Sequence, residues 1–179
     1  MLTDRFCVIG AGAAGLGAME VLQRRGIAFD CFERSERVGG HWHTDYESLH
    51  LITSRDLSGF AGYPMPSDYP VYPSRDQMRG YLESFASDTG VRAHVRFGVR
   101  VERVTPLGPA GRDGWQVETS DGPVREYTGV LVCNGHLWDQ RIPDYPGEFT
   151  GRQIHSGEYR SIDDIEGTRV LTVGSGRPR

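Results

Sequence analysis

Three glycines near the N-terminus are spaced to bind a diphosphate. Gly10, Gly12 and Gly15 follow a short apolar run in the pattern G-x-G-x-x-G. Gly10 lets a strand turn sharply, Gly12 lets backbone N–H groups approach a diphosphate, and Gly15 lets the next helix pack closely. The N-terminus of that helix offers unpaired N–H groups and the positive end of its dipole, which favour an anion. The turn therefore predicts a dinucleotide site.

An acidic residue stands where such a site needs one. Glu33 ends a second apolar run, 29–32, and its carboxylate is placed to accept hydrogen bonds from a ribose 2′-OH. A bare glycine motif is weak evidence for a nucleotide site. Here a strand precedes the glycines, a helix follows them and the acid comes at the expected distance, so the prediction is specific.

A second, incomplete motif lies at the other end of the sequence. Residues 168–173 read as a strand and are followed by Gly174 and Gly176. The sequence shows no third glycine, helix or ribose acid after them. Because a turn needs its helix to present the amides, we expect this half-motif to hold a second dinucleotide poorly. The alternative is an ordinary strand that ends in glycine.

Composition excludes several classes of function. The 179 residues suit one large domain, or one and a fraction, and the net charge of −4 without a basic stripe argues against nucleic acid. No apolar run is long enough for a membrane span, and the first residues lack a signal peptide, so we expect a cytoplasmic protein. All twenty basic residues are arginine, which excludes a Walker-A or Schiff-base lysine. The three cysteines are far apart without C-x-x-C, and we predict buried structural thiols and no metal site.

Periodicity predicts two helices. One runs over 13–25 and ends at Gly26, and the other opens with a capping box at 74–77 and ends at Gly90. Each repeats apolar residues at helical spacing. The predicted buried faces comprise Leu16, Met19 and Leu22 in the first helix, and Met78, Tyr81, Leu82 and Phe85 in the second.

The stretch between the second helix and Cys133 reads as strands. Three runs, 99–105, 115–119 and 127–132, alternate apolar and polar residues around Asp-Gly turns. We predict an antiparallel β-meander, inserted over 95–127, and a buried central strand over 128–133 that rejoins the first sheet. The fold class is then α/β, a doubly wound, Rossmann-like parallel sheet with this insertion, and the proline-rich tract 47–73 is irregular. The expected domains are 1–150, which binds the dinucleotide, and 151–179, a linker and the start of a second nucleotide-binding domain.

Together these motifs resemble the flavin-containing monooxygenases. The similarity covers essentially the whole chain, as the N-terminal part of such an enzyme. It rests on the glycine turn, on the loop Gly39-Gly40-His41-Trp42, on Asn134-Gly135-His136, and above all on residues 149–159. That segment fits the family fingerprint F-x-G-x-x-x-H-x-x-x-Y at every fixed position. Its final Tyr159 favours this branch over the related Baeyer–Villiger monooxygenases, which usually carry Trp there.

The resemblance implies two cofactors, FAD at the first glycine motif and NADPH at the second. Residues of the first motif would hold the FAD diphosphate, and those around Glu33 its ribose. The implied FAD contacts are Gly10, Gly12, Ala13, Ala14, Gly15, Glu33, Arg34, Gly40, His41, Trp42, Thr53, Asn134 and Gly135. Gly174 and Gly176 would belong to an incomplete NADPH site. Core packing is the alternative for Trp42, and a solvated loop is the alternative for the histidines at 41, 43 and 50.

Two positions depart from the family pattern. Many members place Asn after a Thr near the flavin ring, whereas this chain has Thr53-Ser54, which makes Ser54 the candidate catalytic residue. A hydroxyl donates one hydrogen bond but reaches less far than a carboxamide. Cys133-Asn134-Gly135 replaces the commoner Ala-Thr-Gly, and we expect binding to survive this change. His155 is expected to act in a hinge, bonded to backbone or cofactor, rather than as a base or metal ligand.

The implied activity is NADPH-dependent transfer of one oxygen atom from O₂ to a soft nitrogen or sulfur nucleophile in a small molecule. A non-catalytic FAD-binding module or fragment stays open, because the NADPH site is incomplete. A flavoprotein disulfide reductase shares the fold, but the missing C-x-x-C counts against it. A dehydrogenase that uses nicotinamide alone gives no role to residues 39–42 and 149–159.

Overall fold

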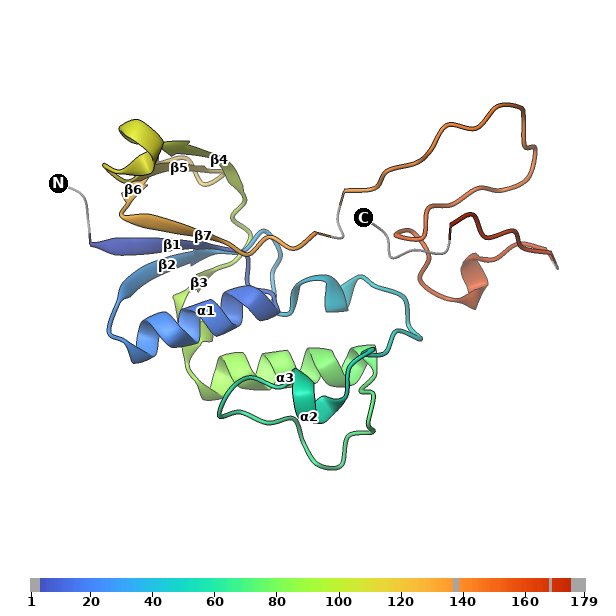
Figure 1. The fold of residues 1–179 in the computed structure, drawn as a ribbon, viewed down its shortest axis with the longest axis horizontal. Helices are drawn as coiled ribbons and strands as arrows, with labels where there is room; N and C mark the ends of the chain where they lie inside the picture. The colour runs from blue at the N-terminus through green and yellow to red at the C-terminus, as the bar shows by residue number, and fades with distance from the viewer. Residues whose placement is uncertain (1–3, 137–138, 168, 175–179) are drawn as a thin grey trace.

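A four-stranded parallel sheet forms the centre of the molecule. The computed structural model describes residues 4–136, 139–167 and 169–174. Strands β1 (Arg5–Ile9), β2 (Ala28–Phe32), β3 (Val95–Arg96) and β7 (Gly129–Val132) lie in the order β3-β2-β1-β7, all parallel (Figure 1). Ile9 is paired with Phe32 on one side and with Val132 on the other. The carboxyl ends of these three strands therefore meet at one edge.

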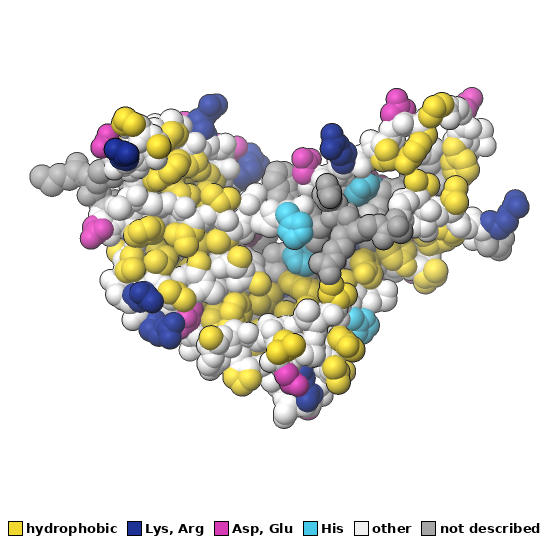
Figure 2. All heavy atoms as spheres, viewed as in Figure 1, with side chains coloured by type: hydrophobic (Ala, Val, Ile, Leu, Met, Phe, Trp, Pro, Cys, Tyr) yellow, Lys and Arg dark blue, Asp and Glu magenta, His cyan; other side chains and the backbone are white. Residues whose placement is uncertain are grey.

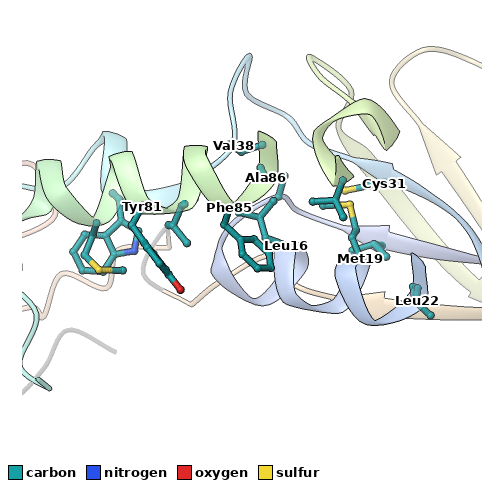
Figure 3. Close-up of a cluster of buried hydrophobic side chains, with 14 of the residues drawn as sticks. Leu16, Met19, Leu22, Cys31, Val38, Tyr81, Phe85 and Ala86 are labelled. Atoms are coloured by element: carbon teal, nitrogen blue, oxygen red, sulfur yellow. The ribbon is translucent and has the colours of Figure 1, made fainter. Parts of the chain in front are cut away.

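The two helices that the periodicity predicts lie on one face of this sheet. Helix α1 (Ala13–Arg24) buries Leu16, Met19 and Leu22, and Gly26 follows it at φ +67°. Helix α3 (Arg75–Asp88) begins with the predicted capping box, in which Ser74 Oγ accepts from Gln77 N–H and Gln77 Oε1 accepts from Ser74 N–H. Figure 3 shows side chains of both helices, among them Leu16, Met19, Phe85 and Ala86, gathered in one buried cluster with Cys31 of β2.

A three-stranded antiparallel sheet covers the other face. Strands β4 (Val101–Pro106), β5 (Trp115–Thr119) and β6 (Arg125–Tyr127) form the predicted meander. A second core lies between the sheets and consists of Cys7, Phe32, Val117 and Tyr127. Side chains of β1 alternate accordingly, with Val8 in the core beneath the helices and Cys7 in the core beneath the meander. The parallel sheet is thus buried on both faces.

The boundaries of the meander differ from the prediction. Val95–Arg96 pairs with β2 in the parallel sheet, so the insertion begins after residue 96. The predicted run 127–132 is two strands, because Tyr127 pairs with β5 whereas β7 starts at Gly129 and pairs with β1. Among the described residues β7 is an edge strand, half-buried with Val132 66% exposed, so the prediction of a buried central strand was wrong. Alternation within one run does not reveal which sheet each half joins.

The remaining segments are short or irregular. The predicted irregular tract contains only the four-residue helix α2 (Arg55–Ser58). The other short elements are 3₁₀ turns, namely η1 (Gly40–His43), η2 (Val91–His94), η3 (Pro109–Gly111) and η4 (Ile162–Asp164). Beyond β7 the chain runs away from the sheets (Figure 1), and large apolar side chains such as Phe149 and Leu171 are exposed there. Within the described residues, none of the helices has the length and apolar character that crossing a membrane requires.

Candidate dinucleotide-binding site

The first glycine motif forms a tight turn between β1 and α1. Gly10 has φ +99°, and its N–H donates to the carbonyl of Phe32 at the end of β2 (2.9 Å). A Cβ on Gly10 would lie 2.6 Å from the Cys133 carbonyl oxygen, and one on Gly15 would lie 1.9 Å from the Gly10 carbonyl oxygen. Both glycines are therefore required for close packing of strand, turn and helix, as their spacing predicts.

Gly12 faces open space and a second glycine. It is the N-cap of α1 with φ −77°, and a Cβ there would have only the Gly40 Cα within 4 Å among the described atoms, at 3.8 Å. The two loops are tied together because Gly39 N–H donates to the Ala11 carbonyl (2.9 Å). Two glycine-containing loops thus meet without side chains between them, which leaves their backbone accessible to a ligand.

The start of α1 is suited to an anion. Ala13 and Ala14 are exposed, and this helix, which the structure describes in full, has neither an acidic residue in its first turn nor a side-chain cap. The first N–H groups of a helix have no partner within the helix. They therefore point, with the positive end of the dipole, toward the space beside Gly12 and Gly40.

Glu33 lies at the same edge of the sheet and is 7% exposed. Its Oε2 accepts from the Ala11 N–H (2.7 Å), and its Oε1 accepts from the Ser35 N–H (2.9 Å). Each carboxylate oxygen has two acceptor positions, so capacity for a ribose hydroxyl is left on both. Arg34 follows as an exposed side chain.

A third segment, which follows β7, lies at the same edge of the parallel sheet. The Cys133 N–H donates to the Ile9 carbonyl (2.9 Å), which places the end of β7 against the glycine turn. The Asn134 Cα lies 3.5 Å from the Cβ position of Gly10, and Gly135 has φ +74°. Sequence-predicted residues of three distant segments are thus brought together around Gly10 and Gly12.

The loop after Glu33 leads into the turn η1. Trp42 is 8% exposed and belongs to the core beneath the helices, as its core-packing alternative proposes. His41 is exposed and hydrogen-bonds through Nδ1 to the Asp45 carboxylate, and its ring centroid lies 4.8 Å from that of Trp42. Whether either side chain contacts a flavin stays a prediction.

The histidines of this loop differ from one another. His41 and His50 are exposed, as a solvated loop implies, but the His43 side chain is only 9% exposed. Its Nε2 donates to the Val38 carbonyl (2.6 Å), and its buried Nδ1 has no hydrogen-bond partner among the described residues. A solvated position for His43 was therefore wrong, because its ring fills the space under Gly39. The described residues contain no group of three potential metal ligands.

A hollow that the sequence reasoning missed lies beside Glu33. It has a volume of about 270 Å³ and is lined by Ser35, Glu36, Arg37, Gly40, His43 and Thr44. Three of these residues, 35–37, lie between Glu33 and the loop Gly39-Gly40, and that position was the available signal. Figure 2 shows histidine side chains in the middle of the molecule, between the layered body and the C-terminal segment.

Thr53 and Ser54 are not joined to this edge by any described contact. Thr53 Oγ1 lies 2.6 Å from Ser58 Oγ, and Ser58 Oγ donates to the Ser54 carbonyl (2.8 Å). Ser54 is the N-cap of the short helix α2. A catalytic role for Ser54 therefore stays a prediction.

The fingerprint segment, 149–159, leads back to residues that follow the loop Gly39-Gly40. The Glu47 N–H donates to the Arg160 carbonyl (2.8 Å), and the rings of Tyr46 and Tyr159 have centroids 5.9 Å apart. His155 Nδ1 accepts from the Gly157 N–H (3.0 Å), in accord with the expected bond to backbone.

The second glycine motif has no strand where one was predicted. Residues 169–174 are irregular and exposed, including Gly174, and Gly176 lies outside the described residues. A strand needs a neighbour to accept its hydrogen bonds, and no neighbour for 169–174 is present in the described part of the chain. The strand was predicted because this segment repeats the order of the first motif, an apolar run followed by G-x-G.

The three cysteine thiols are in a weakly reactive state. Burial is the main cause of a raised pKa for each of the three cysteine thiols, and it contributes most to raising the pKa of Cys7 to about 12. The reactive thiolate is therefore disfavoured at neutral pH. Cys7, Cys31 and Cys133 are free cysteines. This arrangement fits structural residues and offers no redox disulfide.

Comparison with known proteins places this geometry in a family. Residues 3–178 match the profile of the flavin-binding monooxygenase-like proteins. The chain belongs to that family. It is 35% identical over 172 residues to the indole-3-pyruvate monooxygenase YUCCA1 of Oryza sativa subsp. japonica. The aligned region covers 94% of this chain and 41% of that protein.

Solved structures agree with the assignment. An S-allyl-L-cysteine S-oxygenase from Allium sativum superimposes with a TM-score of 0.79 at 29% identity, over 89% of this chain and 43% of that one. OTEMO, solved in complex with FAD and NADP, superimposes with a TM-score of 0.69 at 26% identity, over 82% of this chain and 28% of that one. The chain thus spans about two fifths, or less, of these proteins.

Proposed function

We propose that this chain is the FAD-binding part of a flavin monooxygenase that uses NADPH and O₂. The reaction would insert one oxygen atom into a soft nitrogen or sulfur nucleophile of a small molecule. The observation that carries the proposal is the meeting of three segments, 10–15, 39–40 and 133–134, around Gly10 and Gly12, with Glu33 bonded to the same turn.

The residues present fit FAD. The amides at the start of α1 would hold the diphosphate, because the Gly12–Gly40 approach leaves backbone accessible there. Glu33 keeps acceptor positions for the adenosine ribose. FAD, when bound, supplies the redox and oxygen chemistry, and the protein supplies binding, orientation and exclusion of water. Ser54 remains our candidate for a hydrogen bond near the flavin ring.

The related proteins support the substrate class. Two of them are named as a monooxygenase and an S-oxygenase, and a third was solved with FAD and NADP. Sulfur is a soft nucleophile, which agrees with the class that the family resemblance implies. We infer a small-molecule substrate and no nucleic-acid partner, in keeping with the acidic net charge of −4. All three thiols are free, with Cys7 and Cys31 buried and Cys133 half-buried, and this supports a reducing, cytoplasmic location.

A non-catalytic FAD-binding module is the second candidate. The specific observation in its favour is the irregular, exposed course of residues 169–174, where a second nucleotide turn would require a strand. We expect this chain by itself to bind FAD but to show no NADPH-dependent oxygen consumption.

The test is spectroscopic. Purified protein is mixed with FAD, separated from free cofactor and examined for flavin absorbance bands. NADPH is then added while the absorbance and the oxygen concentration are followed. Retained flavin bands that NADPH does not bleach are the expected result. Bleaching with oxygen uptake would favour the complete enzyme over the module, and protein that retains no flavin would contradict FAD binding.

A further inference from the structure

Glu33 makes two hydrogen bonds within the chain that its expected ribose contact does not explain. Oε2 accepts from the Ala11 N–H at 2.7 Å, and Oε1 accepts from the Ser35 N–H at 2.9 Å. Ala11 is fully buried and stands between the first two glycines of the turn. The carboxylate therefore connects the end of β2 directly to the diphosphate turn.

The backbone of Glu33 is itself fixed. Its N–H donates to the Arg96 carbonyl (3.0 Å), and its carbonyl accepts from the Val99 N–H (3.0 Å). The neighbouring Phe32 carbonyl accepts from the Gly10 N–H (2.9 Å). The side chain thus extends from a rigid support to a turn that contains glycines and would otherwise have high conformational freedom.

We propose that Glu33 is a positioning residue for the diphosphate turn. Its carboxylate holds the Ala11 amide, and with it residues 10–12, in the conformation that receives a diphosphate, independently of any ribose contact. This role rests on the proposed function and adds to the ribose role, since both oxygens retain an acceptor position. Preorganisation of this kind strengthens binding because the turn is ordered before the ligand arrives.

The chemistry requires a carboxylate. Two N–H donors face two different oxygens, so a glutamine could satisfy only one of them and would present its own N–H₂ group to the other. A buried donor without an acceptor is costly. Glu33→Gln therefore breaks at least one of these bonds while it keeps the size of the side chain.

Two ligands separate the positioning role from the ribose role. ADP carries the ribose hydroxyls, and 2′,3′-dideoxy-ADP lacks them but keeps the diphosphate. Affinities for both are measured by calorimetry for the wild type, E33Q and the control E102Q. Glu102 is an exposed carboxylate paired with Arg100 on the antiparallel sheet, so its substitution matches the charge change outside the site.

We expect E33Q to bind 2′,3′-dideoxy-ADP about tenfold more weakly, and ADP at least that much more weakly, because a charge-assisted hydrogen bond within the turn is lost whichever ligand is present. Without ligand, E33Q should melt roughly 5 °C below the wild type, and the Ala11 amide should exchange its hydrogen faster. E102Q should leave all of these values near those of the wild type. If E33Q does not fold, Glu33→Asp, which is one methylene shorter, supplies the same measurements.

An E33Q protein that loses affinity for ADP alone, with unchanged melting and Ala11 exchange, would overturn the positioning role. Wild-type protein that binds neither FAD nor ADP would overturn the proposed function and this inference with it. The two failures are distinguishable, because the first is seen only in the variant and the second already in the wild type.

Discussion

At the scale of single residues, the glycines of the turn differ in the steric constraint that each one meets. Gly10 and Gly15 are required by packing, since a Cβ on either would collide with backbone of this chain. Gly12 is different, because a Cβ there would make only an ordinary contact with the Gly40 Cα at 3.8 Å. The sequence pattern alone does not distinguish the three positions, because each is glycine. Only the structure separates glycines that packing requires from one that packing within the chain does not require, and for Gly12 we predict a role in binding the ligand.

Paired alanine substitutions test this difference. Gly15→Ala should lower the free energy of unfolding by about 3 kcal/mol or prevent folding, because the 1.9 Å approach to the Gly10 carbonyl forces the helix to shift. Gly12→Ala should cost only about 0.5 kcal/mol through its N-cap position. Its FAD affinity should nevertheless fall about tenfold, because the new methyl group faces the ligand space. Urea unfolding and flavin fluorescence measure the two effects, and a G12A protein that binds FAD normally would contradict the assignment.

At the scale of elements, the turn between β5 and β6 is held by charge. The Asp121 carboxylate accepts from Arg125 and from the Thr119 hydroxyl, and these bonds lower its pKa from 3.8 to about 2. The guanidinium of Arg125 also lies 5.2 Å from the centre of the Phe32 ring in the second core. The turn is therefore linked to the packing between the two sheets.

This link predicts a pH dependence. The pKa of Asp121 is lower in the folded protein than in the unfolded chain, so its contribution to stability is present above about pH 4 and is lost as the pH falls to about 2. Asp121→Asn should lower the melting temperature at pH 6, and the difference from the wild type should shrink over that acid range. Melting curves of D121N and of the control D68N, at an exposed aspartate of the irregular tract, measure it. A difference that stays constant to pH 2 would contradict this role.

Elements with local signals were predictable from the sequence, and those defined by distant partners were not. The capping box at Ser74 and the left-handed glycine at 26 fix helix ends within a few residues, and the structure confirms both. By contrast, the break at Thr128 depends on which sheet each neighbouring strand joins. The burial of His43 depends on the position of the Gly39 loop above it, which no pattern in the sequence reports.

At the scale of the whole molecule, three layers enclose two cores that share the strands β1 and β2. A polar link joins the layers, since Asp30 of β2 accepts from Tyr127 of β6 (2.9 Å) and from Arg5 of β1 (3.0 Å). The glycine turn was predictable because a fixed spacing encodes it. Convergence of residues 39–40 and 133–134 on that turn follows from the topology, and the sequence indicated it only through the family resemblance.

The C-terminal segment contrasts with this layered body and should be cleaved first by a protease. The layered body ends near residue 136, and beyond it the side chains of Arg141, Arg152 and Arg160 are exposed on irregular chain. Proteases need an accessible, locally unfolded stretch, which the sheets and helices do not offer. Brief trypsin treatment should therefore leave a resistant fragment that ends at Arg141, identified by mass.

The contact between Tyr46 and Tyr159 restrains part of the C-terminal segment. Tyr159→Ala should therefore speed cleavage after Arg160 relative to the control Y145A, whose ring is exposed. First cleavage inside the antiparallel sheet, for example after Arg103, would contradict this division of the molecule.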